Sequence, residues 1–345
     1  MTFNLLKLKQ HLRIIGHNPW LLGLHPNILN YLKYKIEKKR TTVDIHKRGV
    51  VYTTLYLTRR CNLNCRFCIV ARTTNTRDHR EFEMSPGQCR RIMEHPAFNR
   101  SLYVMLSGGE PLLNDHIGDI VRLLKGQKRI VSVTTNGLLL PRKLDRLLEA
   151  GLDSINISVY DETIEKLREI VPVAAAASFV KLCKLVTRDM LHDPGKVEEA
   201  AELAAASNCG GLYLANVLPG PGTSHDISAG VVFENDPAFE PFQRRLKRKF
   251  PGLPIHFFAP LQRTPRKRVC QIPWYLGIVD NQGNYGFCCY DHLCNKGNIY
   301  DEALSRFHNG DPWPRVRGEI LDPSAPMTVF CRNCYLLNDR WAAKV

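Results

Sequence analysis

The N-terminal part of the sequence lacks a long apolar run. Its first 40 residues contain no stretch of the roughly 18 apolar residues that a membrane span needs, and no short apolar core followed by a small-residue cleavage site. We therefore expect a cytoplasmic protein. A reducing compartment keeps thiols free, so the 12 cysteines are expected to serve metal binding or catalysis and not disulfides. At 345 residues, 44% of them hydrophobic, the chain can form one large domain and a smaller one.

Acidic residues are scarce in two segments. Residues 1–50 contain ten Lys and Arg against two acids, and residues 241–279 contain nine and no acid, so these segments account for the net charge of +15. Such clusters can meet the phosphates of a nucleic acid, a phosphorylated or nucleotide-linked substrate, or anionic lipid. A solvated charged face explains each of them equally well. Because the rest of the chain is close to neutral, the charge alone does not favour nucleic acid as the partner.

Between the basic segments, short β-rich runs alternate with helical patterns. Strands are expected at 51–58, 101–108, 129–136, 154–160, 183–191 and 211–218. Helices are expected at 85–95, 115–125, 141–150, 161–181 and 194–207, with Ser85 and Asp115 as N-caps and Gly151 as a stop signal. Serial β-α units predict a parallel sheet, open or curled into a barrel. Both designs place the chemistry at the C-terminal ends of the strands.

Composition divides the chain into four parts. We expect a basic helical leader at 1–50, the β-α domain at 51–235, a basic linker at 236–269 and a small cysteine-rich domain at 270–345. In the leader, Leu5, Leu8, Leu12 and Ile15 recur at helical spacing, as do Ile28, Leu32 and Ile36. These stripes predict two helices that dock on the barrel. The alternative is an amphipathic, basic surface that contacts a membrane or a carrier protein.

One ligand is missing from the cysteine cluster that follows the first strand. Cys61, Cys65 and Cys68 follow the pattern C-x3-C-x2-C. A structural zinc site needs four protein ligands, and the neighbouring sequence offers no fourth. Three thiolates on a cubane cluster leave one iron open to another molecule.

This motif resembles that of the radical S-adenosylmethionine (SAM) superfamily. In that family the open iron is chelated by the amino and carboxylate groups of SAM. Electron transfer then cleaves SAM to methionine and a 5′-deoxyadenosyl radical, which abstracts hydrogen from the substrate. The resemblance implies a partial (β/α)6 TIM-type barrel, bound SAM, a [4Fe-4S] cluster on Cys61, Cys65 and Cys68, and a reductant such as flavodoxin or ferredoxin.

Four further motifs follow later strands, and each is similar to a SAM-binding element of the family. They are "SGGEP" (107–111), "TTNG" (134–137), "ISVYD" (157–161) and "ANVLPGPG" (215–222). Taken singly, each is explained by turn glycines or a helix cap, but their order at successive strand ends favours the resemblance. The SAM contacts that it implies are Phe67, Ser107, Gly108, Gly109, Glu110, Asn136, Ser158, Arg168 and Leu218.

Four C-terminal cysteines resemble those of the SPASM/Twitch extensions found on many radical SAM enzymes. They are Cys270, Cys288, Cys331 and Cys334. Since no cysteine follows the last of them, we expect one auxiliary [4Fe-4S] cluster in a Twitch-like domain. A zinc ribbon on the same residues is the alternative, and Cys289 can replace Cys288 as the ligand. Cys289 and Cys294 are also candidate hydrogen donors to a substrate radical, or else spare thiols beside the metal.

The resemblance implies a radical SAM oxidoreductase of the dehydrogenase type. We expect hydrogen abstraction from a polar small molecule, anionic or neutral, with a sugar, an aminocyclitol and a nucleotide-linked sugar as candidates, and with the auxiliary cluster accepting an electron. Peptide modification and epimerisation are alternatives, as is RNA modification with the basic segments as phosphate tracks. A non-enzymatic iron-sulfur carrier would explain the cysteines but not the SAM-binding motifs.

Overall fold

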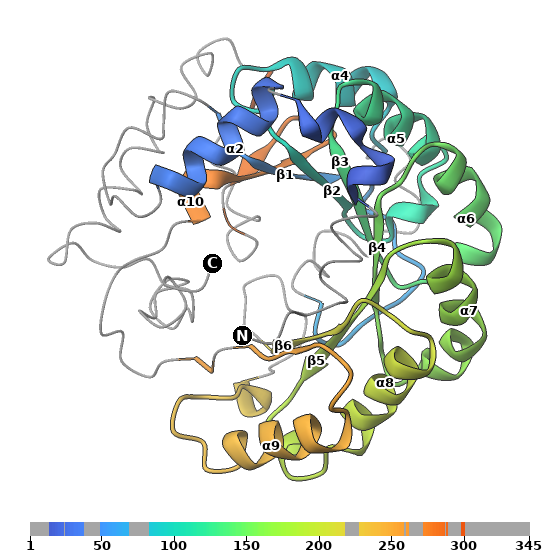
Figure 1. Ribbon diagram of the computed structural model, residues 1–345, viewed down its shortest axis with the longest axis vertical. Helices are drawn as coiled ribbons and strands as arrows, with labels where there is room; N and C mark the ends of the chain where they lie inside the picture. Colours follow the sequence, from blue (N-terminus) through green and yellow to red (C-terminus); the bar gives the residue numbers. More distant parts are fainter. Residues whose placement is uncertain are drawn as a thin grey trace, which may run out of the picture.

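The structure is a computed structural model of the chain, and it describes residues 14–23, 25–37, 49–68, 83–217, 228–258, 260–261, 272–286, 288 and 298–300. Within these residues, nine strands form one sheet in the order β7-β6-β5-β4-β3-β2-β1-β8-β9. All neighbours pair in parallel except β8 and β9. Figure 1 shows that the sheet curves and that helices cover its outer face. The predicted α/β fold with a mostly parallel sheet is confirmed.

The elements follow one another as alternating strands and helices over most of the described chain. The strands are β1 (Tyr52–Tyr56), β2 (Tyr103–Ser107), β3 (Ile130–Thr135), β4 (Ser154–Ser158), β5 (Val180–Val186), β6 (Leu212–Asn216), β7 (Ile255–His256), β8 (Leu276–Asp280) and β9 (Tyr285–Gly286). The α-helices are α2 (Pro26–Glu37), α4 (Pro86–Glu94), α5 (Ile117–Gly126), α6 (Leu140–Glu149), α7 (Ile164–Ala177), α8 (Gly195–Ala206), α9 (Phe239–Lys249) and α10 (Ile272–Tyr275). Short 3-10 helices are η1 (Pro19–Leu22), η4 (Pro111–Leu113), η5 (Asp189–Leu191) and η6 (Ser228–Gly230).

Alternation along the strands separates the two faces of the sheet. In β5, the residues from Val180 to Val186 are alternately buried and half-buried. The apolar buried positions join a hydrophobic core with the inner faces of the helices, for example Leu182 with Leu167 of α7 and Val197 of α8. The other positions point into the curve of the sheet, because successive side chains leave a strand on opposite faces. The interior of the curve is therefore less tightly packed than the helix-covered face.

Two predicted boundaries were wrong around β5. The strand begins at Val180 and not at Cys183, and α7 ends at Ala177. The alanine run and the following apolar residues made the helical pattern look longer than it is, whereas residues 189–191 form η5. Ser85 is confirmed as an N-cap by a reciprocal capping box with Gln88. Asp115 is not an N-cap, because the cap of α5 is His116.

The segment expected to be a linker contains helix α9 and strand β7, which extends the sheet beside β6. Phe242 and Leu246 of α9 are buried one helical turn apart, so this helix is amphipathic in spite of its many charges. Beyond it, β8 pairs in parallel with β1 and forms a hairpin with β9. The start of the cysteine-rich segment is therefore part of the main sheet.

Helix α2 contacts the ends of the sheet through polar residues. Asn27 Nδ2 donates to the Lys128 carbonyl at 3.1 Å, and Asn30 Nδ2 to the Arg100 carbonyl at 3.2 Å. Tyr34 is buried, whereas Leu32 is 46% exposed. The predicted contact stripe through Leu32 was wrong, because the two asparagines and the rings of Tyr31 and Tyr34 make the contact. Among the described helices, none is both long and apolar enough to span a membrane.

Candidate active site

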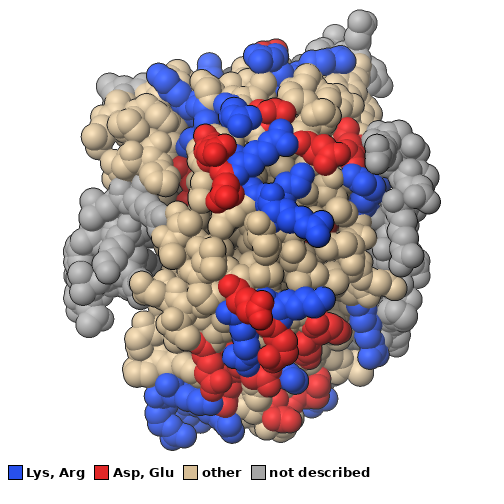
Figure 2. Space-filling model, turned by 90° about the vertical axis from the view of Figure 1, so that its right-hand side faces the viewer, with Lys and Arg blue, Asp and Glu red and all other residues tan. Residues whose placement is uncertain are grey.

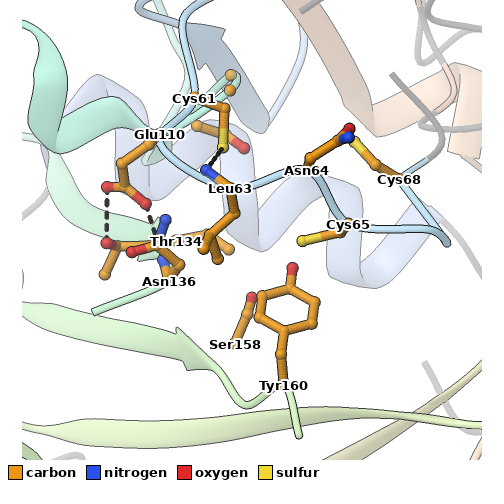
Figure 3. A pocket seen from close by; sticks show the side chains of 14 residues that line it. Cys61, Leu63, Asn64, Cys65, Cys68, Glu110, Thr134, Asn136, Ser158 and Tyr160 are labelled. Carbon is orange, nitrogen blue, oxygen red and sulfur yellow. Dashed lines mark hydrogen bonds between the residues drawn. The ribbon is translucent and has the colours of Figure 1, made fainter. Parts of the chain in front are cut away.

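The loop that follows β1 lies against a cavity at the C-terminal ends of the first four strands (Figure 3). The cavity measures about 160 Å³, and the loop after β1 lines it together with residues of β2, β3 and β4. The lining includes Cys61, Cys65 and Cys68 after β1, Ser107 to Glu110 after β2, Thr134 to Asn136 at β3, and Ser158 and Tyr160 at β4. Residues far apart in the sequence meet here because parallel strands end at the same edge.

Two glycines allow the loops after β1 and β2 to lie in direct contact. Gly109 N donates to the Thr58 carbonyl at 2.9 Å, and Glu110 N to the Arg60 carbonyl at 2.8 Å. A Cβ atom at Gly108 would overlap the Thr58 carbonyl oxygen, and one at Gly109 the Arg60 carbonyl oxygen. Gly108 also has φ +133°, a conformation that favours glycine. The "GG" pair thus fixes the cysteine loop to the end of β2.

Two arginines anchor the start of the cysteine loop. The Arg60 guanidinium donates to the Leu113 carbonyl at 2.8 Å and pairs with Glu83. Arg59 reaches the other way, to the Asp280 carboxylate at 3.3 Å at the end of β8. The chain is thereby held on two sides before it reaches Cys61, by η4 and Glu83 through Arg60 and by β8 through Arg59.

Glu110 places a buried carboxylate in the wall of the cavity. Its side chain accepts hydrogen bonds from Thr135 Oγ1 at 2.7 Å, Asn136 N at 2.8 Å and Leu112 N at 3.0 Å. Burial raises the pKa of Glu110, and these hydrogen bonds oppose that shift. No described cationic side chain forms an ion pair with it. A buried carboxylate with amide and hydroxyl donors but no cation suits a ligand's ammonium group.

Asn136, Ser158 and Tyr160 complete the wall opposite the cysteines. Asn136 Nδ2 donates to Asn62 Oδ1 at 2.7 Å, which links β3 to the cysteine loop. The hydroxyl of Tyr160 is hydrogen-bonded to both Ser158 and Cys65, and Figure 3 shows it pointing at the Cys65 side chain. Burial raises the pKa of Cys65 to about 12, and the hydrogen bond from Tyr160 opposes this shift.

The three thiols fit an iron-sulfur cluster better than one metal ion. A single zinc ion draws its sulfur ligands to one point, about 2.3 Å away. Among the described residues, no three ligating side chains are grouped in that way. The three thiols nevertheless line the same cavity, and a cubane binds each thiolate through a different iron, so the thiols need not converge.

The remaining predicted site residues are more dispersed. Phe67 lines a neighbouring cavity of about 640 Å³ together with Arg66, Arg188 and His192. Arg168 lies on the outer helix α7, where it pairs with Glu165 at 3.4 Å, and it lines neither cavity. Cys288 follows β9 and packs against the core. Leu218, Cys270, Cys289, Cys294, Cys331 and Cys334 lie outside the described residues.

Sequence reasoning missed Tyr160 and Thr135, although a signal for each was present. Tyr160 stands two positions after Ser158, so alternation along an extended chain returns it to the same face. Thr135 lies within the "TTNG" motif, directly before Asn136. Both residues bond to a predicted site residue, Tyr160 to Cys65 and Thr135 to Glu110.

The basic cluster of α9 is largely neutralised by acids. Glu198 of α8 accepts from Arg245 Nε at 2.6 Å and from Lys249 Nζ at 2.8 Å. Lys249 also pairs with Glu202 at 2.9 Å, and Arg244 with Glu240 at 2.8 Å. On the face shown in Figure 2, Lys and Arg side chains are interspersed with Asp and Glu. This helix therefore offers no continuous basic track.

Comparison with known proteins agrees with the site. Residues 55–221 match the model of the Radical SAM superfamily. A curated relative, the GTP 3′,8-cyclase of Alkaliphilus oremlandii, is 33% identical over 129 residues, which are 37% of this chain and 40% of that protein. The chain thus spans about 40% of the length of the curated relatives that it matches.

Two solved structures share the fold at low sequence identity. Streptococcus suis SuiB bound to precursor peptide SuiA is 14% identical with a TM-score of 0.65, and the match covers 90% of this chain and 74% of that one. BtrN in complex with AdoMet and 2-DOIA is 15% identical with a TM-score of 0.50, covering 83% of this chain and 93% of that one. At these identities the likeness concerns the fold.

Proposed function

Since residues 55–221 form a radical SAM superfamily domain, we propose that this protein is a radical SAM enzyme that abstracts hydrogen from a polar small molecule. The main support is the convergence of four strand ends on one cavity, where three thiols face a buried carboxylate that has no cationic partner among the described residues. A radical SAM domain implies SAM and a [4Fe-4S] cluster.

The residues of the site have separate roles in this proposal. Cys61, Cys65 and Cys68 would hold three irons of the cluster. The bound cluster would supply the electron that cleaves SAM to methionine and the 5′-deoxyadenosyl radical. Glu110 would accept the ammonium group of SAM, held in place by its three hydrogen-bond donors. Ser158 offers a hydroxyl to the ligand from the opposite wall. Phe67, in the adjoining cavity, would pack against the adenine.

Arg168 has no role in this proposal. Arg168 lies on the outer helix α7 and pairs with Glu165. Groups that line the cavity would therefore bind the SAM carboxylate instead. The side chains available there are Asn136 and Ser158, together with the Tyr160 hydroxyl. Arginine is therefore not needed to explain how the cavity holds an anionic group.

The substrate we propose is a polar, anionic small molecule. The name GTP 3′,8-cyclase describes the relatives, and it makes a nucleotide the first compound to test ahead of a free sugar or an aminocyclitol. The aligned region covers only 37% of the chain, so the similarity alone does not assign GTP as the substrate of this protein.

The outcome we propose is a two-electron oxidation that uses an auxiliary cluster on Cys270, Cys288, Cys331 and Cys334. An epimerase would instead use Cys289 or Cys294 as the hydrogen donor.

RNA modification is less well supported. The ion pairs of α9 with α8 occupy two of the basic side chains that would have followed the phosphates, Arg245 and Lys249. Peptide modification has only the fold similarity to SuiB in its favour, and at 14% identity that similarity does not extend to the substrate.

The test of the proposed function is reductive cleavage of SAM. Anaerobically reconstituted protein is incubated with dithionite and SAM, and 5′-deoxyadenosine is measured. We expect the wild type to form it, Cys65→Ala to form none, and Glu110→Gln to form less because its affinity for SAM falls. Equal amounts from the wild type and Cys65→Ala would rule out radical SAM chemistry. Deuterium transfer from labelled GTP and labelled sugars into 5′-deoxyadenosine would then identify the substrate class.

A further inference from the structure

Lys181 places a cation inside the curve of the sheet. It lies on β5 among the half-buried positions, on the face opposite the helices. Its Nζ atom lies 5.2 Å from the centre of the Tyr213 ring and 5.4 Å from that of Phe179. The rings hold the ammonium group through their negative faces, and burial lowers the pKa of Lys181.

Other enclosed lysines of this barrel have carboxylate partners, and Lys181 has none among the described residues. Lys184, on the same strand, pairs with Asp161, and Lys125 pairs with Asp153 at 2.7 Å. Among the described residues, the acidic group that acts on the pKa of Lys181 is the Cys183 thiol. Enclosing a cation without a counter-ion costs free energy. A function that brings an anion to Lys181 would explain why the charge is kept there.

The strand register places Lys181 next to the SAM cavity. Lys181 pairs with Asn156 of β4, and two residues further along, Cys183 pairs with Ser158, which lines that cavity. Two residues of a parallel strand span roughly 6.6 Å. Lys181 therefore lies one inward-facing position closer to the N-terminal end of β5 than the level of Ser158, where the radical would form.

Neighbouring strands add donors at the same place. Cys183 pairs with Tyr213 of β6, and Tyr213 with His256 of β7. The rings of Tyr213 and His256 are stacked at 4.2 Å. No acidic residue occupies the described interior positions of β4 to β7, which carry Lys181 and hydrogen-bonding groups together with the apolar Leu185 and Ala215.

We propose that Lys181 binds an oxyanion of the substrate, a carboxylate or a phosphate, with Tyr213 and His256 beside it. This inference rests on the proposed function and specifies the substrate class of the same barrel. An anion held there would leave the next few bonds of the substrate at the level of Ser158. The reacting C–H bond would then lie a few bonds from the anionic group.

The test uses inorganic pyrophosphate and malonate as probes, with the holoenzyme in the presence of SAM. Affinity is measured by calorimetry for the wild type, Lys181→Met and Lys181→Arg. Methionine keeps an unbranched chain between the two rings and removes the charge. We expect binding at least tenfold weaker in Lys181→Met and partial recovery in Lys181→Arg. The matched control is Lys196→Met, which removes an exposed lysine that pairs with Glu199 on α8 and should bind like the wild type.

A second readout does not require any variant to fold. The probe that binds should protect Lys181 of the wild type from acetylation, mapped by mass spectrometry, while Lys196 reacts as before. Protection by pyrophosphate alone indicates a phosphate, and protection by malonate alone a carboxylate. Equal affinities in the wild type and Lys181→Met, or no binding of either probe to the wild type, would overturn the proposal. SAM cleavage by the same wild-type preparation tests the proposed function separately.

Discussion

At the scale of single residues, two glycines hold the cysteine loop against the end of β2. Gly108 and Gly109 permit the backbone of the second strand end to touch the loop that precedes Cys61. Their sequence signal is strong because no other residue fits so close an approach. The sequence alone is equally consistent with two glycines in an ordinary turn. The packing of the structure shows that they lie where the loops after β1 and β2 touch.

We expect Gly109→Ala to displace the cysteine loop. Its methyl group would overlap the Arg60 carbonyl, which is backbone and cannot rotate away. The free energy of unfolding should fall by about 1–3 kcal/mol, the usual cost of overpacking, and the iron content after reconstitution should fall with it. The control is Gly126→Ala in α5, where a Cβ meets nothing within 4 Å and the change is expected to stabilise by up to about 1 kcal/mol. Normal iron content in Gly109→Ala would contradict this account of the loop.

The Tyr160 hydroxyl allows a sharper test at the cluster itself. A hydrogen bond to a ligating sulfur stabilises the more reduced, more negative state of a cluster. Because Tyr160 bonds to Cys65, Tyr160→Phe should shift the reduction potential of the cluster to a more negative value. The shift is measured by redox titration followed by electron paramagnetic resonance. Tyr103→Phe, which removes a hydroxyl from the Tyr52 and Tyr103 ring stack, is the control, and an equal shift in both would refute the specific role of Tyr160.

At the scale of elements, the sequence was most informative where periodicity and capping agreed. Ser85 and the apolar positions of α4 predict that helix almost to the residue. Helix α7 and strand β5 were misplaced because Ala174 to Ala177 favour a helix in isolation, and tertiary pairing with β4 and β6 decides where the strand begins. Helix α9 was missed because its many charged residues obscured the apolar spacing of Phe242 and Leu246. The acids that pair with its basic side chains lie on α8 and on α9 itself, which only the structure shows.

The contact of α8 with α9 predicts a pH dependence. Hydrogen bonding from Arg245, then from Lys249, lowers the pKa of Glu198, whose side chain is 8% exposed. A carboxylate with a lowered pKa in the folded state stabilises above its ordinary pKa of about 4.3, and this contribution is lost as the pH falls through the lowered value. Glu198→Gln should therefore unfold more easily than the wild type at pH 7, by about 1 kcal/mol or less after solvent screening.

The difference in the free energy of unfolding between the wild type and Glu198→Gln should shrink towards zero when denaturant unfolding is repeated near pH 3.5. Glu199→Gln, which removes an exposed pair with Lys196, is the control and should differ little from the wild type at either pH. A Glu198→Gln difference that stays constant with pH would mean that packing, and not charge, is responsible.

At the scale of the whole molecule, the hairpin β8-β9 brings the start of the cysteine-rich segment into the main sheet. Its Asp280 accepts from Arg59 next to the cluster loop, and Asn281 accepts through its carbonyl from Gln88 of α4 at 3.0 Å. Cys288 follows directly after this hairpin. The sequence shows the order of these motifs but not their spatial proximity, because strand β8 joins β1 across more than 200 residues of chain.

The iron and zinc content per chain tests whether the chain binds two separate clusters. If Cys270, Cys288, Cys331 and Cys334 bind an auxiliary [4Fe-4S] cluster, anaerobically prepared wild type should hold about eight irons per chain. Cys65→Ala and Cys270→Ala should then each hold about four, because each loses a different cluster. About four irons with one zinc would indicate a zinc ribbon on the later cysteines. About four irons in the wild type and no loss in Cys270→Ala would remove the auxiliary cluster, and with it the electron acceptor that a two-electron oxidation requires.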